Sequence, residues 1–299
     1  MNDRYPGART SVWGGVGVLL VALGGHVGGQ EPQRSDPKPP LPRVEKDVVY
    51  APGGDEHKLD LYLPAKPGFA TVVFTYGGGW HTGSRKSVTP IGEKLQGLGY
   101  GCALLSHRLG PKDKFPAQIE DVAAGFAWVK QHIAAKGGDP KRVFLMGHSS
   151  GAHLSVLLAT DPKYLAKHRL KPADIAGVVG LSTPVDLSPR KDGKGFGDAL
   201  LAGRGAAVFG RDVGLMREAS PIRHVTKDLP PVLLVVGERD FPMLAGDAQA
   251  FVAKAHEAGA RASWFQLKDR DHMGVVRCLL EQPSPVLERV QDFLSKPGG

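Results

Sequence analysis

The stretch VFLMGHSSGAH places a serine where a strand would turn sharply into a helix. Ser149 lies between Gly147 and Gly151 in a G-x-S-x-G pattern, a turn that holds the serine hydroxyl clear of the sheet in strained backbone geometry. The glycines are needed because a Cβ there would collide with the neighbouring strand or helix. The flanks fit, since residues 142–146 predict a buried strand and residues 152–159 an apolar helix. The pattern predicts a nucleophilic serine, with an ordinary glycine-rich turn as the alternative.

A serine hydroxyl becomes a useful nucleophile only if a base removes its proton and an acid orients that base. In a strand–turn–helix of this kind, the partners follow the serine in the order acid, then histidine. Of the eleven histidines, only His256 and His272 lie beyond the last well-placed acid. His256 falls inside a predicted helix, whereas His272 falls in a predicted loop after the last predicted strand. We therefore predict that His272 is the base.

The acid should leave the sheet at the same edge as the nucleophile. Asp240 does so, because it follows the predicted strand 231–237. Asp186, which follows the preceding predicted strand, is the alternative acid. Asp269 and Asp271 are too near the histidine, in the same predicted loop, to orient it well. The sequence therefore predicts Asp240 as the acid.

A tetrahedral intermediate also needs N–H donors for its negative oxygen, and losing one donor costs roughly 10²–10³-fold in rate. Three glycines follow a predicted strand directly in the stretch VVFTYGGGWHTG. Because glycines carry no side chain, the amides of Gly78 and Gly79 can approach a substrate oxygen closely. We predict these two donors, with the N–H of Ser150 as a third; a flexible loop is the alternative. Trp80 is predicted to line the substrate pocket.

An alternation of strands and helices must position these residues. The predicted strands are 44–50, 57–64, 70–76, 100–106, 142–146, 175–182, 231–237 and 262–268, and the predicted helices are 89–98, 115–135, 152–159, 243–258 and 285–295. The first two strands would form an antiparallel hairpin. The remainder predict an α/β fold with a mostly parallel central sheet and helices on both faces.

Residues 186–220 break this alternation. The segment is rich in glycine and charge, with only short helical pieces, and it lies between two predicted sheet strands. It should therefore project from the edge where those strands end. We predict a small cap insertion over the site, with a disordered surface insertion as the alternative.

The start of the chain differs in kind from the rest. Residues 1–29 carry Arg4 and Arg9 before a short apolar stretch and then small residues. This layout is typical of a secretory signal peptide and predicts export, periplasmic or secreted, with an uncleaved membrane anchor as the alternative. Residues 30–43 predict a proline-rich linker. Residues 44–299 would then form the catalytic domain.

The charge and the cysteine content argue against several other classes of protein. The net charge is +8, but the basic residues are scattered among acids, so no nucleic-acid partner is predicted. The two cysteines, Cys102 and Cys278, provide neither a disulfide framework nor a metal-ligand cluster. Cys102 is predicted to be a small buried apolar residue. No metal or organic cofactor is implied.

Taken in order, these motifs resemble the α/β-hydrolase superfamily, in particular its esterase and lipase branch of BD-FAE and hormone-sensitive-lipase-like carboxylesterases. The resemblance covers residues 44–296 and rests on YGGGWHTG, SHRLGP with FPAQIEDV, GHSSGAH, ASPIRHV, GERD and RDHMG. It implies Ser149 as nucleophile, Asp240 as acid, His272 as base and the second and third glycines of GGG in the oxyanion hole. Tyr76 departs from the family pattern, which usually has histidine before the glycines.

The resemblance implies a serine hydrolase that cleaves carboxylic esters through an acyl-enzyme intermediate. The expected substrate is a small-molecule or saccharide-linked ester, with no obligatory membrane partner; the sequence predicts no oligomeric state. The same three side chains could serve an amidase or peptidase of the arylformamidase type. A non-catalytic binding protein on the same fold is a further alternative, although such proteins usually lack one of the three, and none is missing here.

Overall fold

The structure is a computed structural model that describes residues 10–12, 14, 41–203 and 205–296. Two compact units are distinguished, Met1–Lys38 and Pro39–Gly299, and the strands and helices found among the described residues lie in the second. Most of the predicted signal peptide and of the predicted linker lies outside the described residues, so both stay predictions. Among the described residues, no helix has the length and apolar character needed to cross a bilayer.

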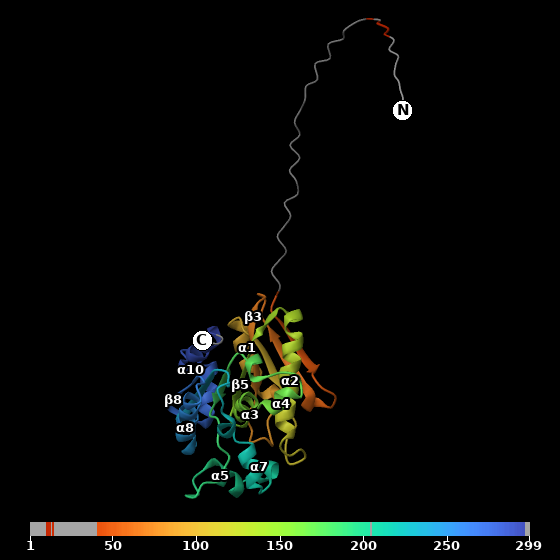
Figure 1. Cartoon of the computed structure of the whole chain (residues 1–299). Helices are drawn as coiled ribbons and strands as arrows, with labels where there is room; N and C mark the ends of the chain where they lie inside the picture. The colour runs from red at the N-terminus through yellow and green to blue at the C-terminus, as the bar shows by residue number, and fades with distance from the viewer. Residues whose placement is uncertain (1–9, 13, 15–40, 204, 297–299) are drawn as a thin grey trace, which may run out of the picture. The chain divides into compact units, whose positions relative to one another are not determined.

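The strands of the described residues form one eight-stranded sheet (Figure 1). They are β1 Arg43–Val49, β2 Lys58–Leu63, β3 Phe69–Thr75, β4 Gly101–Leu105, β5 Gly138–His148, β6 Val178–Leu181, β7 Val232–Arg239 and β8 Ala262–Asp271. Their spatial order is β1-β2-β4-β3-β5-β6-β7-β8. The pairs β1–β2 and β2–β4 are antiparallel and the others are parallel. The predicted hairpin and mostly parallel sheet are confirmed.

The helices include the long ones that the sequence predicts. They are α1 Thr89–Gly97, α2 Ala117–His132, α3 Ser150–Thr160, α4 Pro162–Ala166, α5 Phe196–Ala202, α6 Ala206–Phe209, α7 Val213–Glu218, α8 Met243–Glu257, α9 His272–Arg277 and α10 Pro285–Ser295. Short 3₁₀ helices span Asp55–His57, Arg85–Val88, Ala134–Lys136, Pro172–Asp174, Pro221–His224 and Cys278–Leu280.

One local prediction is wrong. The sequence predicts a loop at His272, but β8 continues to Asp271 and His272 is the first residue of α9. The Asp271 side chain accepts a hydrogen bond from the N–H of Gly274, 2.6 Å away, which caps this short helix. A helix of six residues is too short to show an apolar period, so the sequence did not reveal it.

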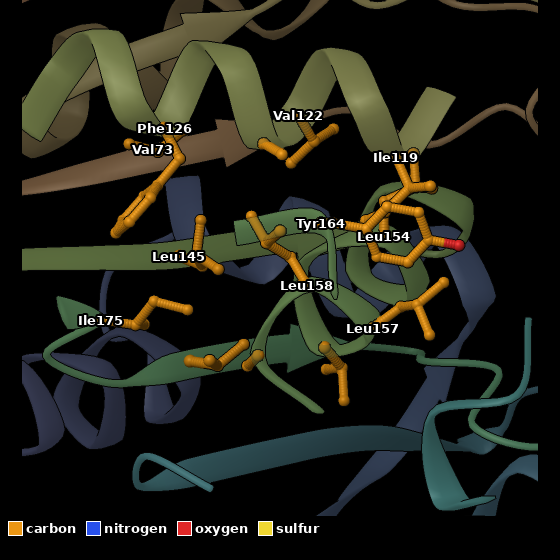
Figure 2. Packing of buried hydrophobic residues seen from close by; sticks show 14 of the residues in the cluster. Val73, Ile119, Val122, Phe126, Leu145, Leu154, Leu157, Leu158, Tyr164 and Ile175 are labelled. Carbon is orange, nitrogen blue, oxygen red and sulfur yellow. The ribbon is translucent and has the colours of Figure 1, made fainter. Parts of the chain in front are cut away.

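Two apolar clusters, one on each face of the sheet, form the core. Consecutive strand residues alternate between them, so Val73 lies in one cluster and Val72 in the other. Helices α2, α3 and α8 contribute to the first cluster, and α1 and α10 to the second. Figure 2 shows Val122 and Phe126 of α2 directed toward Leu145 of β5. The predicted helices on both faces of the sheet are therefore confirmed.

The segment 186–220, called the cap segment below, carries the three short helices α5, α6 and α7. In Figure 1, α5 and α7 lie together beyond one end of the sheet. Arg190 of this segment forms an ion pair with Asp247 of α8. The N–H of Leu187, near the start of the segment, donates to the Oγ of Ser220 at its end, 2.9 Å away. The two ends of the cap segment are thus joined by a hydrogen bond, and Arg190 links the segment to α8.

The Asp247–Arg190 pair predicts a pH dependence of stability. Asp247 is 1% exposed, and this burial raises the pKa of its carboxyl to about 6 despite the opposing pull of Arg190. Because the folded pKa exceeds the unfolded value near 3.8, the folded state retains a proton between these pH values that the unfolded state has lost. The carboxyl therefore adds stability as pH falls through this window and loses it as pH rises.

We expect the free energy of unfolding of wild type, relative to that of Asp247→Asn, to increase when the pH is lowered from 7 to 5. Urea unfolding of both proteins at both pH values measures this. Because both contain the same histidines, the titration of those histidines cancels in the difference. A difference that is independent of pH would contradict the assignment.

Candidate active site

Ser149 lies at the sharp turn between β5 and α3, with φ 55° and ψ −122°. This conformation is strained for a residue with a side chain. A Cβ built on Gly147 would lie 2.5 Å from the carbonyl carbon of Gly151, and one built on Gly151 would lie 2.2 Å from the oxygen of Thr75. The collisions predicted from the sequence are therefore present, and the turn requires glycine at both places.

This crowding predicts a specific loss of stability. We expect Gly151→Ala to lower the free energy of unfolding by about 1–3 kcal/mol or more, because the added methyl group meets backbone that belongs to a central strand. Gly246 of α8 is the matched control: a Cβ there meets no atom within 4 Å, so Gly246→Ala should stabilise the protein by about 0.4–1 kcal/mol. Urea unfolding measures both, and equal effects at the two positions would refute the steric account.

The structure brings the three predicted catalytic side chains into one hydrogen-bonded chain. The Nε2 of His272 is 2.9 Å from the Oγ of Ser149, and the Nδ1 of His272 is 2.6 Å from an Oδ1 of Asp240. Asp240 follows β7, and His272 follows β8. All three residues thus come from the carboxyl ends of parallel strands, at one edge of the sheet.

Ser182, which the sequence analysis missed, supports the acid. Its Oγ donates to the Oδ2 of Asp240 across 2.5 Å, and the N–H of Phe241 donates to the Oδ1 across 2.8 Å. Burial alone would raise the pKa of Asp240, but the hydrogen bonds from His272 and Ser182 hold the pKa of this carboxyl below its usual range. Asp240 therefore stays ionised near neutral pH, as an acid that orients an imidazole must.

His148 is a second residue that the sequence analysis missed. Its Nε2 is 2.9 Å from the carbonyl oxygen of His272, so this nitrogen carries a proton and donates. Burial, together with the neighbouring His272, lowers the pKa of His148 to about 4. His148 is therefore neutral near pH 7 and fixes the start of α9 without adding a charge beside His272.

The residues considered as alternatives to Asp240 and His272 do not join the hydrogen-bonded chain that includes Ser149. Asp186 accepts the N–H of the residue two positions later, Asp269 pairs with an arginine at the end of β7, and Asp271 caps α9. His256 lies on α8 and bonds to a backbone carbonyl. None of these four contacts Ser149 or Asp240 by a hydrogen bond in the described part of the chain. Within the same residues, no three His, Cys, Asp or Glu side chains gather as metal ligands.

The residues 77–80, called the glycine loop below, follow β3 and border the nucleophile turn. A Cβ on Gly77 would lie 2.9 Å from the carbonyl oxygen of His148, so the loop and the turn are in close contact. Gly78 and Gly79 both have positive φ, 138° and 61°. Their N–H groups and that of Ser150 have no hydrogen-bond acceptor among the described residues. Three donors are thus free near Ser149 to bind a substrate oxygen.

Tyr76, the departure from the family pattern, contacts His107 and makes no hydrogen bond to Ser149, Asp240 or His272. Its ring stacks on His107 with the ring centroids 4.7 Å apart and the planes 15° from parallel. It is buried, and burial raises the pKa of its hydroxyl to about 12. The side chain therefore shapes the base of the glycine loop and stays protonated.

A cavity of about 690 Å³ opens beside Ser149 and His272. Its lining is mostly apolar, and its apolar side chains include Trp80, Val88, Ile91, Phe196, Leu200, Phe241, Met243, Met273, Val276 and Leu280. Phe196 and Leu200 come from α5 of the cap segment, which thus lines part of the cavity. The volume is within the range of pockets that enclose a small organic ligand.

Comparison with known families gives one match that spans most of the fold. The BD-FAE family model matches residues 59–254. Among curated proteins, esterase LipQ of Mycobacterium tuberculosis is 29% identical over 83% of this chain and 61% of its own length. Esterase LipC of the same organism is 31% identical over 70% of this chain and 54% of its own. The isoprenylcysteine alpha-carbonyl methylesterase ICME of Arabidopsis thaliana is 28% identical over 77% of this chain and 56% of its own length. The chain thus spans about half to three-fifths of the length of these relatives.

Solved structures show the same architecture. A truncated carbohydrate esterase from gut microbiota superposes with a TM-score of 0.73 at 22% identity, covering 88% of this chain and 98% of that one. A propionate-bound thermophilic esterase of the Planctomycetes species Thermogutta terrifontis gives a TM-score of 0.67 at 24% identity, covering 87% and 95%. At these identities the likeness concerns the fold, and it shows an α/β-hydrolase fold.

Proposed function

The chain belongs to the BD-FAE family within the α/β-hydrolase esterases, and from this premise we propose that it is a serine hydrolase that cleaves carboxylic esters through a covalent acyl-enzyme. The resemblance drawn from the sequence is confirmed at the level of family and fold. In the proposed mechanism Ser149 is the nucleophile, His272 the general base and acid, and Asp240 the residue that orients His272.

The observation that carries this proposal is the unbroken chain of hydrogen bonds from Asp240 to His272 to Ser149, at 2.6 and 2.9 Å. The Nδ1 of His272 donates its proton in a hydrogen bond to the ionised carboxylate. The Nε2 is therefore unprotonated, and its lone pair faces the hydroxyl of Ser149. Ser149 and His272 are then within the distance that proton transfer requires, and Asp240 is within hydrogen-bond distance of the imidazole that it orients.

In the first half of the reaction, the Nε2 of His272 accepts the hydroxyl proton while the Oγ of Ser149 attacks the ester carbonyl. The oxygen of the tetrahedral intermediate gains negative charge, which the N–H groups of Gly78, Gly79 and Ser150 stabilise. His272 then gives its proton to the leaving alkoxide, so the alcohol departs and the acyl group stays on Ser149.

In the second half, water replaces the alcohol. His272 removes a proton from the water as it attacks the acyl carbonyl, and the same N–H groups bind the second oxyanion. Collapse of this intermediate breaks the bond to Oγ, and His272 returns the proton to Ser149. The carboxylic acid is released and the enzyme is regenerated without a cofactor.

The mostly apolar cavity supports a small-molecule ester with an apolar acyl or alcohol group. The α5 residues Phe196 and Leu200 would contact that group, which gives the cap segment a role in substrate binding. Export through residues 1–29 also remains part of the proposal; it is supported by the sequence alone, and cell fractionation tests it.

Turnover of p-nitrophenyl esters from acetate to octanoate tests the proposal, with p-nitroanilides of the same acids as the matched amides. We expect ester hydrolysis, with faster turnover of esters than of the corresponding anilides. Preferential cleavage of the anilides would favour the amidase alternative. No cleavage of either class would favour the non-catalytic alternative.

A further inference from the structure

Trp80 ends the glycine loop in a conformation that its neighbours must enforce. It has φ 62°, a left-handed backbone that a bulky residue adopts only when the surroundings hold it there. Its side chain is 2% exposed. The indole packs edge-on against two rings of the cap segment, Phe196 of α5 and Phe209 of α6, with centroid distances of 6.4 and 5.0 Å. The loop conformation therefore depends on contacts of this side chain.

The indole also begins a buried chain of two hydrogen bonds. The Nε1 of Trp80 donates to the Nδ1 of His153 across 3.1 Å, and the Nε2 of His153 lies 2.7 Å from the carbonyl oxygen of Ala219. A carbonyl only accepts, so Nε2 carries the proton and Nδ1 is free to accept from the indole. One neutral tautomer of His153 satisfies both bonds. Burial lowers the pKa of His153 to about 4, so this neutral form persists near pH 7.

These two bonds connect three separate parts of the site. His153 lies in the first turn of α3, where its own N–H donates to the carbonyl oxygen of Ser149, 2.9 Å away. Ala219 directly follows α7, at the end of the cap segment. The imidazole of His153 therefore links the glycine loop to α3, the helix that follows the nucleophile, and to the cap segment.

We propose that Trp80 and His153 are positioning residues that keep the N–H groups of Gly78 and Gly79 aimed at the substrate oxygen. Glycine peptides rotate easily, so without a fastening beside them the two donors would turn away from the oxyanion. A displacement near 1 Å at such a site can cost about 10²-fold in rate. This inference rests on the proposed function, because it concerns the same oxyanion.

Trp80→Phe tests the fastening, since the variant keeps one aromatic ring at this position and removes the N–H. Trp128→Phe is the matched control: Trp128 of α2 stacks on His132 and does not line the cavity. We expect Trp80→Phe to lower kcat for a p-nitrophenyl ester by about 10- to 100-fold with KM little changed. Trp128→Phe should leave both constants at their wild-type values.

A trifluoromethyl ketone inhibitor provides a readout that a purely structural role would not move. Such ketones form a tetrahedral adduct with a nucleophilic serine, and the oxyanion of the adduct needs the same N–H donors as the transition state. We expect the inhibition constant of Trp80→Phe to rise by the factor by which kcat/KM falls. Thermal unfolding of both tryptophan variants shows whether the fold is retained at the assay temperature.

Two changes at His153 give a second, independent comparison. In His153→Asn the side-chain oxygen lies near the former Nδ1 and can still accept from Trp80, whereas His153→Leu offers no acceptor. The asparagine variant should therefore retain more of kcat and of inhibitor affinity than the leucine variant. This comparison holds even if one tryptophan variant folds poorly.

The outcomes separate this inference from the proposed function. If wild type hydrolyses esters and Trp80→Phe keeps the wild-type kcat and inhibition constant, the positioning role is wrong and the proposed function stands. If His153→Asn and His153→Leu are equally active, the positioning role is likewise wrong and the proposed function stands. If wild type neither hydrolyses esters nor binds the ketone, the proposed function is wrong, and the positioning role is refuted with it.

Discussion

Replacing Ser149 with alanine is expected to lower kcat for p-nitrophenyl ester hydrolysis by about 10⁴- to 10⁶-fold while the protein stays folded. The loss is this large because no covalent intermediate can form without the Oγ. The residual rate comes from substrate binding and from the N–H donors of the glycine loop, which the substitution leaves in place. Initial rates of wild type and variant on the same ester, with thermal unfolding of both, measure the effect.

The neighbouring serine offers a contrast within the same GHSSG turn. Ser150→Ala keeps the backbone N–H and removes an Oγ that has no hydrogen-bond partner among the described residues. We therefore expect it to have a much smaller effect than Ser149→Ala. Comparable losses at both serines would show that the turn, and not the Ser149 hydroxyl, limits the reaction.

Asp240→Asn should have the second large effect, a loss of about 10⁴-fold in kcat. The amide keeps the shape of the carboxyl group but cannot balance the positive charge that His272 acquires when it takes the serine proton. It also favours the tautomer of His272 that presents an N–H, and no lone pair, to the Oγ. Ester turnover across pH 6–9 measures the loss.

Asp186→Asn is the matched control for this prediction, because sequence reasoning left Asp186 as the alternative acid. Its carboxylate accepts the N–H of Ser188 and has no hydrogen bond to His272. We expect at most a small change in kcat from this variant. A large loss in Asp186→Asn, with Asp240→Asn nearly as active as wild type, would reverse the assignment of the acid.

The sequence predicted the architecture and the proximity of the three candidate catalytic side chains because both follow from local pattern and a general rule of topology. Apolar runs located the strands, and the carboxyl ends of parallel strands meet at one sheet edge. Ser149, Asp240 and His272 each follow a strand directly, so their order along the chain sufficed to bring them together. The close approach of Gly147 and Gly151 was likewise encoded in five consecutive residues.

The supporting residues could not be predicted in this way. Ser182 binds an acid 58 positions later, and His153 bonds to the carbonyl of a residue 66 positions later. Such contacts depend on how loops fold back over the sheet, which no local period reveals. A signal was present for Ser182, since it directly follows the strand between those of the nucleophile and the acid. The histidine in SSGAH carried no signal beyond its place in the first turn of an apolar helix.

The most direct test of the account is to identify the residue that acts as the nucleophile. A p-nitrophenyl phosphonate ester would be incubated with the wild-type protein and with Ser149→Ala, and peptide mass spectrometry would locate the adduct. We predict one equivalent of covalent label on wild type, confined to the peptide that contains Ser149, with stoichiometric release of p-nitrophenol and no label on the variant. Absence of label on wild type, or an adduct on any other residue, would contradict the proposed mechanism.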